Sequence, residues 1–265
     1  MKKRYKRQLG CVIVLIVFVA AIFFCFGRYS LKKDKPATAS ENSSCAQADT
    51  LENFAKDHNL NLSDYPDELV NLLNKNPETK DFVYNYPLKR NSNPKIDLSN
   101  YENSKSAPLL MQWDERWGYD TYSGELMGIS GCGPTCLSMV CIYLLKDATF
   151  TPKYVAEFAE NNGYSVFNNG SKWTLISEGG KELGLNVTEI PLDENRIMRN
   201  LKAKNPIVCI MGKGDFTSTG HFIVMTDYVD GKVKVNDPNS KARSEKLWDL
   251  AKIKGQIRNL WVCQK

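Results

Sequence analysis

Histidine is scarce in this chain of 265 residues, which contains only His58 and His221. The sequence also has no C-x-x-C pair and no H-E-x-x-H motif, and its two histidines lie far apart. Structural and catalytic zinc sites depend on such closely spaced ligands. We therefore expect no metal site and no cofactor, and a mechanism that needs an imidazole must use one of these two residues.

Most of the chain also lacks a surplus of positive charge. The net charge is +5, but residues 1–35 hold nine Lys/Arg and one Asp, so the remaining 230 residues carry about −3. Domains that bind nucleic acid usually show a basic surplus, so we expect no nucleic-acid partner. A hydrophobic share of 42% and a charged share of 25% are ordinary for a globular protein and exclude a wholly disordered chain.

Charge is absent from residues 8–27, and five positive charges precede this run. Twenty helical residues span about 30 Å, enough to cross a bilayer. The pattern predicts a cytoplasmic basic tail over residues 1–8 and a single-pass transmembrane signal anchor over residues 9–27. The rest of the chain would then lie outside the cell membrane. A cleaved signal peptide is the alternative, although Ala37-Thr38-Ala39 lies about ten residues beyond the apolar run.

Two segments separate this leader from the main domain. Residues 28–50 are polar and predict a flexible stalk. Residues 51–107 predict a short helical pre-domain followed by a linker from residue 87 onward. Its first helix carries an apolar face that ends at His58, which we expect to have no chemical role, and Pro66 and Pro77 can begin two more helices.

Residues 108–265 predict one α+β domain, because helical patterns come first and strand patterns follow. The Asp230-Gly231 pair predicts a hairpin turn between two of the strands. We expect helices over residues 135–145, from Thr151-Pro152 onward and over 171–184, and strands over 206–211, 222–225, 232–236 and 256–262.

Cys132 is the candidate nucleophile because it lies between two glycines at the start of a predicted helix. The unpaired amides and partial positive charge of a helix N-terminus stabilise a thiolate and can also hold an oxyanion. Cys136 is the rival nucleophile on the same helix face. The electrostatic benefit fades beyond the first turn, which favours Cys132.

A thiol nucleophile needs a base, and His221 opens a predicted strand. If the strands on either side of Asp230-Gly231 pair as a hairpin, Asp237 lies at the same end as His221. Its carboxylate can then accept a hydrogen bond from the imidazole and orient it. Gln112, twenty residues before Cys132, can add a donor to an oxyanion hole.

These segments resemble family thirty-nine of the cysteine peptidases, in particular its stand-alone branch from Gram-positive bacteria. The resemblance implies a papain-like fold, with Cys132 as nucleophile, His221 as base, Asp237 as its orienting partner and a glutamine at the oxyanion hole. Gln112 is the weak match, because exporter-fused members carry the glutamine only a few residues before the cysteine. The motifs that carry the resemblance are Gln112-Trp-Asp-Glu-Arg-Trp-Gly118, Gly131-Cys-Gly-Pro-Thr-Cys-Leu-Ser-Met139, Gly220-His-Phe-Ile-Val224 and Asn236-Asp-Pro-Asn-Ser240.

The expected function is therefore that of a membrane-anchored extracytoplasmic cysteine peptidase with a peptide or protein substrate. Two alternatives remain open. The same triad can serve an amidase or transferase acting on cell-wall peptides, and the fold can persist as a binding module without activity. The residues predict no cleavage preference.

Overall fold

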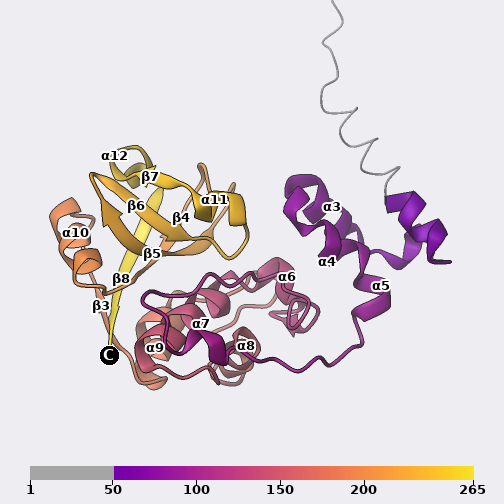
Figure 1. Cartoon of the computed structure of the whole chain (residues 1–265), viewed down its shortest axis with the longest axis horizontal. Helices are drawn as coiled ribbons and strands as arrows, with labels where there is room; N and C mark the ends of the chain where they lie inside the picture. Colours follow the sequence, from indigo (N-terminus) through magenta and orange to yellow (C-terminus); the bar gives the residue numbers. More distant parts are fainter. Residues whose placement is uncertain (1–50) are drawn as a thin grey trace, which may run out of the picture. The chain divides into compact units, whose positions relative to one another are not determined.

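The computed structural model describes residues 51–265. The predicted basic tail, signal anchor and stalk therefore lie outside the described residues. No helix within residues 51–265 is long and apolar enough to cross a membrane. The described residues form an α+β fold in which helices cover an antiparallel sheet (Figure 1), and this fold class confirms the prediction.

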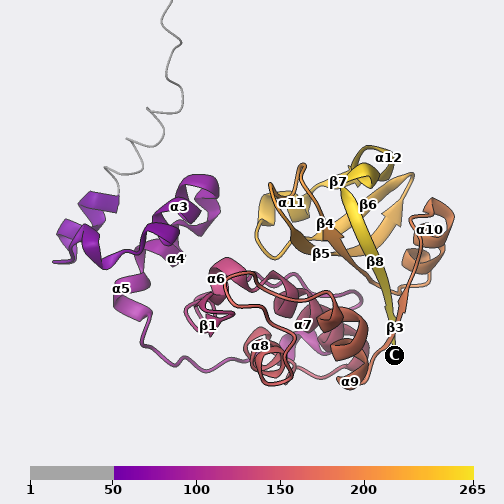
Figure 2. The same cartoon turned by 180° about the vertical axis from the view of Figure 1, so that it is seen from behind.

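One antiparallel sheet organises the second half of the chain. Its strand order is β3-β8-β4-β5-β6-β7, and Figure 2 shows β8 running across it. The four predicted strands correspond to β4, β5, β6 and β8, whereas β3 and β7 are short strands that were not predicted. The strands are β3 (Asn186–Glu189), β4 (Ile207–Met211), β5 (His221–Val229), β6 (Lys232–Asn236), β7 (Leu247–Asp249) and β8 (Ile257–Gln264).

The hairpin between β5 and β6 is the turn expected from Asp230-Gly231. Both residues have positive φ, 47° and 80°. Positive φ at both central positions matches the twist of the flanking strands. The hairpin pairs Val224 with Asn236, so the start of β5 and the end of β6 meet at one end of the sheet.

Helices cover one face of the sheet with α7 at the centre, and α7 packs against β5 (Figure 1). Helix α7 is apolar nearly all round, and every residue from Gly133 to Ile142 is buried. The third predicted helix begins later than residue 171, because Ser171 forms a β-bridge with Ser165. The elements on this face are α7 (Cys132–Leu145), α8 (Pro152–Asn161), the π-helical turn η4 (Leu175–Gly179) and α9 (Gly180–Glu182).

A second apolar cluster lies on the other face, under α10 (Glu194–Lys202) and α12 (Leu250–Ile253). Alternate residues of β4 face the two sides of the sheet. Val208 belongs to the apolar cluster under α7, and Cys209 belongs to the cluster under α10 and α12. This alternation follows from the two-residue period of a strand and explains why β4 is buried throughout. Two further short elements lie nearby in the chain: α11 (Lys241–Glu245) precedes β7, and η5 (Lys254–Gln256) follows α12 directly.

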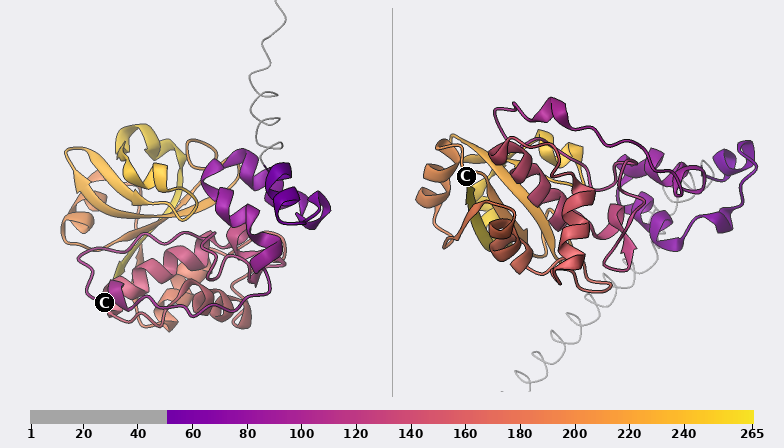
Figure 3. Two further views of the ribbon diagram at one scale, coloured as in Figure 1. Left: turned by 45° about the vertical axis from the view of Figure 1, so that its right-hand side comes forward. Right: turned by 90° about the horizontal axis from the view of Figure 1, so that it is seen from below.

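The pre-domain is helical, as predicted, and packs against the main domain through a third apolar cluster that includes Met111, Trp113 and Tyr119. Figure 3 shows its helices in indigo and violet. The stretch predicted as a linker is also packed, since Leu98 is buried in the core under α7. The elements before α7 are a helix over 51–57, η1 (Leu62–Asp64), α3 (Asp67–Lys75), η2 (Pro77–Thr79), α4 (Lys80–Tyr84), α5 (Tyr86–Lys89), η3 (Ser99–Tyr101), β1 (Thr121–Tyr122), β2 (Glu125–Leu126) and α6 (Met127–Ser130).

Phe82 connects the pre-domain to the main domain and offers a test of this packing. It is 1% exposed, and its ring stacks on Tyr119 with centroids 4.6 Å apart. We expect Phe82→Ala to lower the free energy of unfolding by about 3 to 5 kcal/mol, because the cavity adds to the lost burial. Urea denaturation measures this change, and Leu88→Ala at a half-exposed site of α5 should change it little. Equal effects of the two substitutions would contradict the docked arrangement.

Candidate active site

Cys132 is the first residue of α7, after Gly131 at the N-cap position. The first backbone hydrogen bond of this turn runs from the Thr135 amide to the Gly131 carbonyl oxygen, 3.1 Å away. The amides of Cys132 and Gly133 thus belong to the turn that has no intrahelical partners. Gly133 also permits a close approach, because a Cβ at this position would collide with Ser171. The local fold places a thiol among free amides.

His221 begins β5 and is 7% exposed. Its Nε2 lies 2.7 Å from Oδ1 of Asp237, which follows β6 and is fully buried. A carboxylate only accepts hydrogen bonds, so Nε2 carries the proton of the neutral ring. The other ring nitrogen, Nδ1, is then left for the Cys132 thiol, whose pKa His221 lowers. The hairpin has brought the predicted base and its orienting carboxylate together.

Asp237 has a further ionic partner that sequence reasoning missed. Nε of Arg243 donates to Oδ2 of Asp237 at 2.5 Å, while the Asn239 amide donates to Oδ1 at 2.8 Å. A fully buried carboxylate needs such partners to stay ionised. Arg243 lies on α11, for which Ser240 provides the N-cap. Recognising Ser240 as a cap would have predicted this short helix and placed Arg243 close to Asp237.

The electrostatics of this cluster favour a thiolate–imidazolium pair. Burial acts to raise the pKa of the Cys132 thiol, but the hydrogen bond to His221, the charge of His221 and the amides of Phe222 and Gly133 lower it below its ordinary value. Burial acts to lower the pKa of His221, but Asp237 and Cys132 together raise it to about 10. For Asp237, burial acts to raise the carboxyl pKa, but His221 and Arg243 hold it below its ordinary value.

The sequence profile of the Peptidase_C39 like family matches residues 104–264. The chain belongs to this family. No curated protein sequence matches the chain significantly. Two solved structures are similar to it at 16% identity. The peptidase domain of Streptococcus ComA, a bi-functional ABC transporter involved in a quorum sensing pathway, covers 51% of this chain and 93% of its own with a TM-score of 0.40. A protein from Bacillus anthracis described as a C39-like peptidase covers 65% of this chain and 98% of its own with a TM-score of 0.38.

Gln112 of this C39-like chain is buried beside the Asp237 loop, and its backbone N–H donates to the Pro238 carbonyl oxygen at 2.8 Å. Its side-chain Nε2 donates to the carbonyl oxygens of Gly128 and Ile129, at 2.9 and 3.0 Å. Its Oε1 is buried and has no hydrogen-bond partner among the described residues. Donation to an oxyanion would require Nε2 to release one of these carbonyl groups. The oxyanion role of Gln112 therefore stays a prediction.

The rival cysteine has an environment unlike that of Cys132. Cys136 is fully buried, and burial raises the pKa of its thiol well above the ordinary value. Cys141, Cys209 and Cys263 are also buried, and all five cysteines within residues 51–265 are free thiols. Among these five, only Cys132 is partly exposed. The C39-like chain thus combines exposure and a lowered thiol pKa at the predicted nucleophile.

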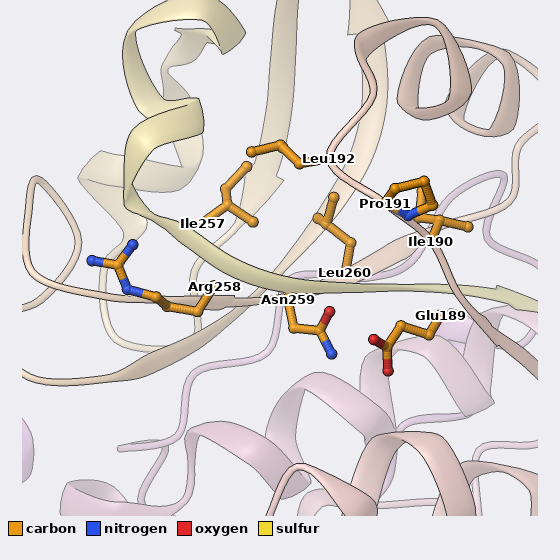
Figure 4. A pocket seen from close by; sticks show the side chains of 8 residues that line it. All are labelled: Glu189, Ile190, Pro191, Leu192, Ile257, Arg258, Asn259 and Leu260. Atoms are coloured by element: carbon orange, nitrogen blue, oxygen red, sulfur yellow. The ribbon is translucent and has the colours of Figure 1, made fainter.

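A separate pocket of about 380 Å³ lies along the start of β8 (Figure 4). Its lining includes Glu189, Leu192, Arg258 and Asn259 but no cysteine, serine or histidine. β4 separates β8 from β5, the strand that begins with His221. The candidate active site of this C39-like chain is therefore defined by its chemistry and not by this pocket.

Proposed function

We propose that this chain is a thiol-dependent peptidase that hydrolyses peptide bonds through Cys132, His221 and Asp237. The observation that carries the proposal is the connected arrangement of the three residues. It joins a thiol of lowered pKa to an imidazole of raised pKa, which in turn is hydrogen-bonded to a buried carboxylate. Membership of the C39-like family supports a peptidase as the reaction class.

The geometry supports the usual two-step chemistry of a cysteine nucleophile. The Cys132 thiolate attacks the carbonyl carbon of the scissile bond, and the amides at the start of α7 stabilise the resulting oxyanion. His221 gives its proton to the leaving amine as the C–N bond breaks, which leaves an acyl-enzyme thioester. The neutral imidazole then takes a proton from water, whose oxygen attacks the thioester. Breakage of the C–S bond releases the acid product and restores the thiolate–imidazolium pair.

The thiolate itself can be tested without knowing the substrate. We expect iodoacetamide to alkylate Cys132 rapidly well below pH 8.5, the ordinary range of a cysteine. Raising the pH through the lowered pKa of Cys132 removes its proton, while the raised pKa of His221 keeps the imidazole charged. Mass spectrometry after labelling from pH 4 to 9 measures the rate at this residue separately from the buried cysteines.

The matched control is His221→Ala, which removes the charge and the hydrogen bond while burial remains. Its Cys132 labelling should appear only near or above pH 8.5. Identical profiles for the two proteins, both rising near pH 8.5, would refute the thiolate–imidazolium pair. Such a result would favour a binding module that retains the fold.

We further propose that the peptidase domain is held at the outer face of the cell membrane by residues 9–27. The support is the basic and then apolar sequence before residue 28. Lysines of the peptidase domain should react with a membrane-impermeant amine reagent in intact cells. Labelling that requires cell lysis would contradict the orientation.

An external position would place the site near the cell wall, which favours a second candidate, an amidase or transferase for wall peptides. Incubation with proteins and with purified peptidoglycan distinguishes the two. New amines from peptidoglycan alone would favour the second candidate.

A further inference from the structure

Glu78 of the pre-domain contacts the loop that follows the candidate triad carboxylate. Its carboxylate accepts hydrogen bonds from the Ser240 hydroxyl at 2.5 Å and from the Lys241 amide at 2.7 Å. The Ala242 amide donates to the same carboxylate at 3.3 Å. One side chain, more than 160 residues away in the sequence, thus holds three consecutive residues at the start of α11.

Neighbouring contacts hold the same loop from the same side. Nδ2 of Asn76 donates to the Asn239 carbonyl oxygen at 2.6 Å, and Nε1 of Trp113 donates to this oxygen at 3.2 Å. Asn76 is 9% exposed, so its amide is directed at the loop and not at solvent. The contact between residues 76–78 and residues 239–242 is therefore polar and directional. It is buried at Asn76 and Ser240 and exposed where Lys241 and Ala242 donate to Glu78.

The Ser240 hydroxyl connects this contact to the candidate catalytic residues. While it donates to Glu78, it also accepts a hydrogen bond from the Arg243 amide at 3.1 Å. Arg243 forms the ion pair with Asp237, and Asp237 binds the ring of His221. The path from Glu78 to the imidazole thus runs entirely through directional contacts that fix the position of α11.

We propose that Glu78 is a positioning residue for the triad, so that docking of the pre-domain helps to assemble the active site. This inference rests on the proposed peptidase function. Glu78 fixes α11, α11 orients Arg243, and Arg243 holds the carboxylate that aligns His221. The pre-domain is then a part of the catalytic unit and more than a spacer before it. Small displacements of aligned groups reduce rates strongly, so loss of Glu78 should affect the reactivity of the thiol.

The test compares Cys132 alkylation across pH in the full-length chain and its variants. We expect Glu78→Ala to slow labelling at pH 6 by about tenfold and to shift the profile toward higher pH. Glu78→Gln keeps one acceptor oxygen, so its labelling rate at pH 6 should lie between those of Glu78→Ala and the unmodified chain. Glu68→Gln, an exposed glutamate on α3 of the same pre-domain, is the matched control and should behave as the unmodified chain. Amide hydrogen exchange at Lys241 and Ala242 should become faster in Glu78→Ala.

A double-mutant cycle separates positioning from general destabilisation. If Glu78 acts through Arg243, then Glu78→Ala adds little to the effect of Arg243→Gln on the labelling profile. Additive effects, or a Glu78→Ala profile equal to that of Glu68→Gln, would overturn the proposal while leaving the peptidase function intact. An unmodified chain that labels only near pH 8.5 would instead overturn the proposed function and this inference with it.

Discussion

Peptide hydrolysis should fall by roughly 10⁴-fold or more in Cys132→Ala, because the acyl-enzyme route is lost and only binding and oxyanion contacts remain. The side chain is small and lies at the start of α7, so the free energy of unfolding should change little. The measurement is kcat/KM on a peptide that the unmodified chain cleaves, with chemical denaturation of both proteins beside it. This pair of results would identify Cys132 as the nucleophile.

The control for this prediction is the other cysteine on the same helix. Cys136→Ala should retain most of the activity, because the Cys136 thiol is buried and its pKa is raised well above the ordinary value. Any loss should appear as reduced stability from the small cavity in the core under α7. Full loss of activity in Cys136→Ala, with Cys132→Ala still active, would reverse the assignment of the nucleophile.

The parts of the fold that the sequence predicted are those with strong local signals. The unbroken apolar run of α7, the Thr151 cap and the turn at Asp230-Gly231 each determine their own conformation. β3 and β7 are short strands of three or four residues whose pairing depends on β8 and β6. Helix α10 was not predicted, although its sequence carries a local signal. Asp193 caps it, and Ile197 and Leu201 lie four residues apart on its buried face.

The site was predictable wherever backbone pairing alone determines proximity. Asp237 could be placed beside His221 because a hairpin of known turn fixes which ends of its strands meet. Arg243 and Glu78 could not be placed in this way. The position of Arg243 depends on a five-residue helix whose local signal is the Ser240 cap, and the position of Glu78 depends on docking between segments more than 160 residues apart. The docking contact leaves no periodic pattern in the sequence.

Arg243 also makes the identity of residue 237 critical. Oδ1 of Asp237 accepts from both His221 and the Asn239 amide, while Oδ2 accepts from Arg243. An asparagine carries only one acceptor oxygen, so in either orientation its NH₂ group must face a donor. It therefore cannot satisfy both sides of the site while Arg243 is present.

Asp237→Asn should accordingly reduce kcat/KM by about 10³-fold or more, because the carboxylate that orients the imidazole and stabilises its charged form is lost. It should also destabilise the fold, since the charge of Arg243 loses its buried partner. Adding Arg243→Gln removes the competing cation and lets the asparagine oxygen face Nε2 of His221. We expect the double variant to recover about tenfold in kcat/KM over Asp237→Asn, which corresponds to about 1.4 kcal/mol of transition-state free energy. Steady-state kinetics of both single variants and the double variant measure this recovery. A double variant no better than Asp237→Asn would show that Arg243 does not determine the orientation of the group that binds His221.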